Sequence, residues 1–241
     1  MKISECIILS GGLGTRLKNT IFDLPKALAP VAGKPFLYYV IEHLKKQGIE
    51  KFIFALGYKH EMIEIYLKEY FFSTNAVPDY PSINYQLSIE ENPLGTGGAI
   101  RSACSKTSAE NILIVNGDTL FKINVAALSH FHQQENADCT LALKPMKNFN
   151  RYGAVEINES GKVQSFREKQ FYENGWINGG VYILNVPSFL QLHLPRQFSF
   201  EKDYLERYCS SKKIMAIIQD EYFIDIGVPE DLEKAGREMD K

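Results

Sequence analysis

A turn with three glycines follows directly after a short apolar segment near the start of the sequence. The segment ECIILS, residues 5–10, has the length and composition of a buried strand, and the turn continues as GGLGTR. Glycines in such a turn let backbone N–H groups approach an anion closely. The spacing matches neither the GxGxxG of dinucleotide-binding proteins nor the GxxxxGK[ST] of a P-loop. On its own, the turn is equally consistent with a plain strand–turn–helix connection.

The first half of the chain alternates strand-like and helix-like segments. Short apolar strands are predicted at residues 51–56, 83–88 and 111–116, and helices at 35–49, 61–72 and 95–107. In the first helix, Phe36, Leu37, Val40, Ile41 and Leu44 recur at helical spacing. This β–α alternation predicts a parallel sheet with helices on both faces.

The second half has a different pattern. Residues 152–169 alternate polar and apolar side chains around a turn at Glu159–Gly161, which predicts an antiparallel hairpin. A strand at 177–185, a helix at 199–210, a strand at 222–227 and a helix from Pro229 follow. The fold class is therefore α/β: a Rossmann-like, mixed but mainly parallel sheet sandwiched by helices, with a smaller antiparallel lobe. We expect a single domain over residues 1–241, divided at about 1–145, 146–220 and 221–241.

Composition excludes several classes of protein. Lys plus Arg number 27 against 29 Asp plus Glu, so the chain has no basic surface suited to nucleic acid or an anionic membrane. No apolar run approaches the roughly 18 residues of a membrane span, and no signal peptide is recognisable, which predicts a cytoplasmic protein. The four cysteines form no CxxC pair, so a zinc or redox site is not expected: Cys6, Cys104, Cys139 and Cys209.

Four charged residues stand at positions suited to phosphate chemistry. Arg16 follows the glycine turn, and Lys26 follows Pro25 in LPKAL. Asp118, in NGD, and Asp225, in FIDIG, each follow a predicted strand, at the edge where parallel sheets bind ligands. Taken singly, the lysine is typical of a surface and the aspartates of turns. Two carboxylates that meet would suit Mg²⁺.

A second glycine-rich turn, LGTGGAI, covers residues 94–100. Its backbone amides would be able to contact a base or a ribose, and Gln86 on the preceding strand carries a carboxamide that can pair with a base. Either feature is weak alone, because a strand glutamine commonly bonds to neighbouring backbone.

Taken in order, the motifs GGxGTRL, LPK, LGTGGA, NGD, YG, EK, NGG and DIGxPxD resemble those of the sugar-1-phosphate nucleotidylyltransferases, also called nucleotide-sugar pyrophosphorylases. The resemblance runs from about residue 3 to residue 235. Within that family, LPKALAPVAGKPFL, ENPLGTGGAI, RYGAVEI and FIDIGVPEDL most resemble the D-glycero-α-D-manno-heptose 1-phosphate guanylyltransferases. The family opening usually reads LAGG, and here Ser10 replaces the alanine.

The resemblance implies a role for each matching position. Residues 1–145 would bind a nucleoside triphosphate, which is GTP in this subgroup, residues 146–220 would bind the sugar 1-phosphate, and residues 221–241 would complete a Mg²⁺ site. The catalytic residues would be Arg16, Lys26, Asp118 and Asp225, with Asp118 and Asp225 as metal ligands. The nucleotide contacts would be Leu9, Gly11, Gly12, Gly14, Thr15, Arg16, Gln86, Gly97 and Asp118. The sugar-phosphate contacts would be Gly153, Glu168, Lys169 and Asn178.

The reaction implied is attack of a sugar-1-phosphate oxygen on the α-phosphorus of the triphosphate, which releases pyrophosphate. A phosphate monoester is already largely ionised near neutral pH, so no general base is needed. The five histidines lie outside the motifs and are interpreted as structural. Alternatives are a hexose 1-phosphate enzyme that uses UTP, CTP or dTTP, a non-catalytic regulatory subunit and, least favoured, an NAD-dependent oxidoreductase. Pairing into a homo-oligomer, through residues 69–85 for example, stays open.

Overall fold

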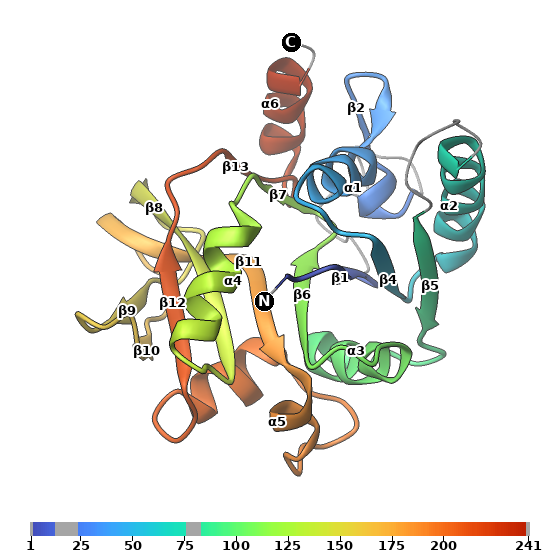
Figure 1. Ribbon diagram of the computed structural model, residues 1–241. Coiled ribbons are helices and arrows are strands. Elements are labelled where there is room, and N and C mark those ends of the chain that lie inside the picture. The colour runs from blue at the N-terminus through green and yellow to red at the C-terminus, as the bar shows by residue number, and fades with distance from the viewer. Residues whose placement is uncertain (1, 13–23, 76–82, 240–241) are drawn as a thin grey trace.

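The computed structural model describes residues 2–12, 24–75 and 83–239 (Figure 1). Seven strands form one sheet in the order β12-β8-β11-β6-β1-β4-β5. Strands β1, β4, β5, β6, β8 and β12 run parallel, and β11 runs against its neighbours β6 and β8. The expected mixed and mainly parallel sheet is confirmed.

The strands of this sheet are β1 (Glu5–Ser10), β4 (Lys51–Leu56), β5 (Asn84–Ile89), β6 (Asn111–Asn116), β8 (Cys139–Phe149), β11 (Tyr172–Asn185) and β12 (Ile214–Ile218). Three two-stranded sheets pair β2 (Pro30–Val31) with β3 (Lys34–Pro35), β7 (Thr119–Phe121) with β13 (Phe223–Asp225), and β9 (Val155–Ile157) with β10 (Val163–Phe166). The helices are α1 (Phe36–Lys46), α2 (His60–Asn75), α3 (Gly95–Ala103), α4 (Val125–Gln134), α5 (Val186–Leu190) and α6 (Pro229–Met239). Shorter helical segments are η2 (Lys26–Leu28), η3 (Cys104–Lys106) and the π-helix η4 (Phe200–Glu206).

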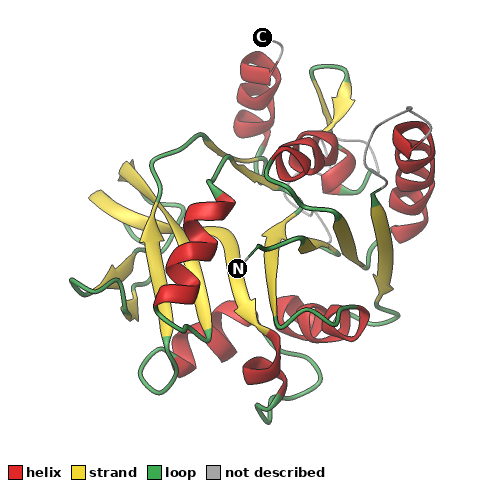
Figure 2. Cartoon of the chain, viewed as in Figure 1, coloured by secondary structure: helices red, strands yellow, loops and turns green. Residues whose placement is uncertain are grey.

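Helices cover both faces of the sheet (Figure 2). Along β1, Cys6 and Ile8 point into a core shared with α1, α2, α4 and α6, whereas Ile7 points into a second core shared with α3, α5 and η4. All three side chains are fully buried. This alternation follows from the two-residue period of a strand that is covered on both sides. Among the described helices, none has the length and apolarity needed to cross a bilayer.

The second half of the chain joins the sheet of the first. The hairpin predicted around Glu159–Gly161 is present as β9 and β10. Strands β11 and β12 extend the main sheet beyond β6, so the sheet is continuous through both halves. The strand at the end of the sequence, β13, pairs with β7 in a separate ribbon. Sequence patterns did not single out β8, β12 or α4. For β8 the reason is that its second half is polar and contains Pro145.

A buried histidine links three of these elements. His132 of α4 is 2% exposed, and its ring nitrogens lie 2.8 Å from Thr140 Oγ1 of β8 and 2.9 Å from Asn111 Oδ1 of β6. Asn111 Oδ1 is an acceptor, so Nε2–H donates to it and Nδ1 accepts from the Thr140 hydroxyl. Burial lowers the pKa of His132 to about 4. The ring is therefore structural and neutral in the folded protein.

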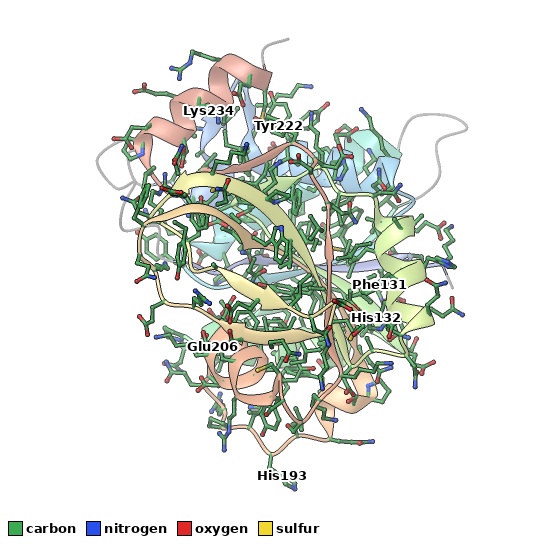
Figure 3. All side chains as sticks on the ribbon, turned by 90° about the vertical axis from the view of Figure 1, so that its left-hand side faces the viewer. Phe131, His132, His193, Glu206, Tyr222 and Lys234 are labelled. Atoms are coloured by element: carbon green, nitrogen blue, oxygen red, sulfur yellow. The ribbon has the colours of Figure 1, made fainter. Side chains whose placement is uncertain are left out.

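We expect this histidine to weaken the fold in acid. His132 becomes protonated below about pH 6.5 in the unfolded chain but only below about pH 4 in the folded protein. The free energy of unfolding therefore falls by up to about 3 kcal/mol as the pH drops from about 6.5 to about 4. In urea titrations from pH 7 to 4, His132→Gln should reduce this loss. The exposed His193, at the tip of a loop in Figure 3, provides the control His193→Gln, which should leave the loss unchanged. An unchanged pH profile in His132→Gln would contradict the assignment.

Candidate active site

Two carboxylates and one lysine meet beside the carboxyl ends of the parallel strands. Asp118 lies between β6 and β7, and Asp225 ends β13. The β7–β13 ribbon pairs Asp225 with Thr119, and the Ile226 amide donates to the Asp118 carbonyl at 3.0 Å. Residues separated by more than a hundred positions are thereby brought together by one antiparallel ribbon.

Lys26 lies between these carboxylates. It belongs to η2, which begins after Pro25. Its Nζ donates to Asp118 Oδ2 and lies 4.0 Å from Asp225 Oδ1. The side chains of Lys26, Asp225 and Asp118 are 14%, 20% and 32% exposed, so the cluster is partly shielded from solvent. The structure thus brings together three of the four residues predicted to be catalytic, while the fourth, Arg16, lies outside the described residues.

The electrostatics of the cluster favour an additional cation. Burial, followed by repulsion from Asp118, raises the pKa of Asp225, and Lys26 opposes that rise. The Tyr152 hydroxyl lies 3.3 Å from Asp225 Oδ2. Carboxylate oxygens are hard ligands, and Mg²⁺ commonly takes one or two of them, together with water and substrate phosphates. Within the described residues, no group of three or more His, Cys, Asp or Glu side chains is placed to hold a metal ion.

A cavity of about 560 Å³ opens beside the cluster at the ends of β1, β4 and β6. Leu9, Gly11, Gly12 and Asp118, all predicted nucleotide contacts, line it. Position and lining agree with the general rule that ligands bind beyond the carboxyl ends of parallel strands. Gly14, Thr15 and Arg16 lie outside the described residues.

The two residues predicted to contact the base lie elsewhere. Gln86 is exposed on the edge strand β5 and does not line the cavity. Gly97 is buried under Phe198, and its amide donates to the Phe198 carbonyl at 3.0 Å, so that N–H is already used. Neither residue lines the described cavity, because Gln86 faces solvent on an outer strand and Gly97 packs against Phe198; their assignment as base contacts stays a prediction.

Glu90 occupies the cavity instead. Its Oε2 accepts from the Leu94 amide at 3.0 Å, and its Oε1 lies close over Gly11 and Gly57, where a Cβ on either glycine would collide with it. Burial raises the pKa of Glu90, while the Leu94 amide opposes the rise. Sequence reasoning missed Glu90; its position between a strand and the second glycine turn was the available signal.

A second cavity, of about 250 Å³, lies on the other side of the carboxylates. Lys169 and Asn178, both predicted sugar-phosphate contacts, line it together with Asp225. Gly153 and Glu168 do not line it. A Cβ at Gly153 would overlap the Arg167 carbonyl, and the exposed Glu168 offers its own carbonyl to Tyr172. The assignment of these two positions to the sugar phosphate stays a prediction.

The second cavity is also lined by several polar residues that the sequence did not indicate. Asn178 Nδ2 donates to the Tyr182 hydroxyl at 2.8 Å, and Asn178 Oδ1 accepts from the Gly180 amide. The other polar lining residues missed by sequence reasoning are Asn116, Thr119, Arg151, Tyr152 and Glu201. Together they make a compact pocket rich in hydrogen-bonding groups, which suits a hydroxylated ligand that carries a phosphate.

The sequence profile described as "Nucleotidyl transferase" matches residues 5–241. The chain belongs to the nucleotidyl transferase family. This agrees with two cavities that meet at a carboxylate–lysine cluster, an arrangement able to hold a nucleotide on one side and an acceptor on the other.

Members of the family with high similarity carry a more specific name. A D-glycero-alpha-D-manno-heptose 1-phosphate guanylyltransferase of Aneurinibacillus thermoaerophilus is 49% identical over 235 residues, covering 98% of each chain. A protein of the same name from Campylobacter jejuni is 47% identical and covers 94% of this chain and 96% of its own. The crystal structure of HddC from Yersinia pseudotuberculosis is 34% identical with a TM-score of 0.86, covering 98% and 100% of the two chains. The same protein complexed with GMP-PN gives a TM-score of 0.84.

Proposed function

We propose that this protein transfers GMP from GTP to D-glycero-α-D-manno-heptose 1-phosphate, giving the GDP-heptose and pyrophosphate. The observation that carries this proposal is the pair of relatives, 49% and 47% identical over nearly the whole chain, that bear the corresponding name. The four free, buried cysteines suit a cytoplasmic enzyme. We assign GTP to residues up to about 145 and the sugar phosphate to about 146–220, with 221–241 completing the metal site.

In the reaction, an oxygen of the sugar phosphate forms a bond to the α-phosphorus of GTP, and the bond from that phosphorus to the β-phosphate oxygen breaks. The nucleophile arrives ionised, so no described side chain needs to remove a proton. The main barrier is repulsion between two polyanions, about 4 kcal/mol for each pair of unit charges at 4 Å and an effective dielectric of 20. Lys26, between the two carboxylates, and Lys169, in the second cavity, offset this repulsion, and we assign Arg16 to the leaving pyrophosphate.

Asp118 and Asp225 would hold Mg²⁺ through their carboxylate oxygens. When bound, the ion supplies charge neutralisation for the phosphates that meet there. Tyr152 and Lys26 orient the two carboxylates through the contacts described above. Orientation of this kind lowers the barrier because the acceptor phosphate and the α-phosphorus are brought together in line.

We assign selection of the base to Glu90. Guanine presents two adjacent donors, N1–H and the N2 amino group, on its pairing edge. A carboxylate accepts from both, whereas uracil and thymine offer one donor, N3–H, flanked by two carbonyl oxygens. A charged acceptor is therefore attractive for guanine and repulsive for pyrimidine carbonyls.

The test is a panel of GTP, UTP, CTP and dTTP against heptose, mannose and glucose 1-phosphates, followed by pyrophosphate release. We expect the highest kcat/KM for GTP with the heptose. Glu90→Gln should reduce the preference for GTP over UTP at least about tenfold, because a carboxamide accepts and donates. The exposed Glu91→Gln is the matched control.

Each alternative has its own result in this panel. A better rate with a hexose 1-phosphate and a pyrimidine triphosphate would replace the heptose assignment by that pair. Absence of turnover with every pair, alongside calorimetric binding of the nucleotide sugar, would identify a regulatory binding protein. An unchanged base preference in Glu90→Gln would remove Glu90 from base selection.

A further inference from the structure

The glycines of the second turn, LGTGG, serve to dock another part of the chain. The segment of residues 194–201, which follows α5 and leads into η4, lies against the N-terminal turn of α3 (Figure 1). A Cβ at Gly95 would lie 2.5 Å from the Phe198 carbonyl oxygen, and a Cβ at Gly97 would overlap the Phe198 ring. A Cβ at Gly98 would lie 2.6 Å from the Arg196 carbonyl oxygen. Only glycine permits this approach.

Hydrogen bonds hold the 194–201 segment in place. The Phe198 amide donates to the Leu94 carbonyl at 3.0 Å, in addition to the Gly97–Phe198 bond already described. The Arg101 guanidinium of α3 donates to the carbonyls of Leu194 and Pro195 at 2.8 and 2.7 Å. The segment is thus attached along its length to the helix that borders the nucleotide cavity.

The attachment positions Glu201, near the start of the π-helix η4. The Thr96 hydroxyl donates to Glu201 Oε2 at 2.8 Å and accepts from the Phe200 amide at 2.8 Å. The Ser199 hydroxyl also bonds Oε2, at 3.0 Å. Within the described residues Oε1 accepts no hydrogen bond. One oxygen of the carboxylate is therefore anchored, and the other is available to a ligand.

Glu201 borders both cavities. Asn116 and Glu201 are the only described residues that line the nucleotide cavity and the sugar-phosphate cavity alike. In the latter, the neighbouring polar groups are those of Asn178 and Tyr182. Burial raises the pKa of Tyr182, and the negative charge of Glu201 adds to the rise. The Glu201 carboxylate is therefore close enough to Tyr182 to act on the sugar-phosphate cavity.

We infer that Glu201 Oε1 accepts a hydrogen bond from the 2-hydroxyl of the sugar 1-phosphate, and that the 194–201 segment positions it to do so. The inference rests on the proposed function, because it needs a sugar phosphate in the second cavity. The two substrates join where the cavities meet, at the anomeric phosphate. The hydroxyl on the carbon next to the anomeric centre is the one nearest that junction.

The experiment compares wild type, Glu201→Gln and the control Glu206→Gln, which changes an exposed residue at the other end of η4 (Figure 3). The glutamine keeps an oxygen for Thr96 and Ser199 and replaces the free oxygen by an amino group. We expect kcat/KM for the sugar 1-phosphate to fall at least about tenfold in Glu201→Gln, as for a lost charged hydrogen bond, with KM for GTP unchanged. Glu206→Gln should match wild type, and thermal unfolding reports the fold of each variant.

Two analogues identify the hydroxyl. With the 2-deoxy sugar 1-phosphate, wild type and Glu201→Gln should become equal within about twofold, because the proposed partner is gone. With dGTP in place of GTP, Glu201→Gln should still lower kcat/KM for the sugar 1-phosphate. A penalty that persists with the 2-deoxy sugar, or that disappears with dGTP, overturns the inference, as does a Glu201→Gln enzyme equal to wild type. Failure of the proposed function is distinct: it appears as no wild-type turnover and no calorimetric binding of the sugar phosphate.

Discussion

Replacing Asp225 or Asp118 with Asn is expected to lower kcat at least about a hundredfold, a loss comparable to that of one strong electrostatic contact in a transition state. Asn has nearly the same shape as Asp, but it lacks the charge that a divalent cation requires. The loss should be read from single-turnover pyrophosphate release at saturating Mg²⁺ and both substrates. Near-normal turnover in either variant would remove that residue from the metal site.

In Asp225→Asn we expect the thermal stability to be retained although kcat falls. Burial and the neighbouring Asp118 disfavour the ionised Asp225 carboxylate, as the raised pKa indicates. A neutral side chain relieves that repulsion, so we expect a Tm equal to or above that of wild type. Asp220→Asn, an exposed carboxylate just before β13, is the matched control and should change neither quantity. A large fall in Tm would show that the kcat loss reflects damage to the fold.

Lys26→Met is expected to lower kcat by about a hundredfold or more, because it removes the one described cation placed between the two carboxylates. The methionine retains the length and apolar stem of the side chain, so the surrounding packing changes little. The dependence of rate on Mg²⁺ concentration should also shift, since the two carboxylates then lack their internal counter-ion. Initial rates across a magnesium titration measure both effects.

Two substitutions control this result. Lys68→Met changes an exposed lysine on α2 and should leave kcat unchanged. Lys26→Arg keeps the positive charge and should retain more activity than Lys26→Met, although a planar guanidinium fits a point-charge site less well. Equal activity of wild type and Lys26→Met would show that Lys26 is only a structural counter-ion.

Sequence reasoning correctly placed residues that come directly after a strand. Asp118, predicted from its place after a strand, lines the cavity that we assign to the nucleotide, because the carboxyl ends of parallel strands converge at one edge of a sheet. Leu9 and Gly11, assigned by resemblance, line the same cavity. The mixed sheet and the β9–β10 hairpin were likewise predictable from periodicity. Lys169 and Asn178, assigned by resemblance alone, also line the expected cavity.

The residues that lie off the expected cavity, or that sequence reasoning missed, depend on tertiary contacts. Gln86 has the right chemistry for a base, but β5 is the outer strand and its side chain faces solvent. Gly97 was predicted to contact the base, yet its missing side chain makes room for Phe198. Glu201 lies about a hundred positions from Thr96, which orients it, and no local pattern encodes such a pairing.

Strand β11, which runs opposite to its neighbours, has a consequence for engineering. It is hydrogen-bonded to β6 of the first half on one side and to β8 on the other, and it also carries Asn178 and Tyr182. The residues that we assign to acceptor recognition therefore belong to the same ladder that supports the proposed nucleotide cavity. The acceptor half is not an interchangeable module: grafting it from a relative would sever that ladder. New acceptor preferences are better sought by replacing individual side chains on an intact sheet.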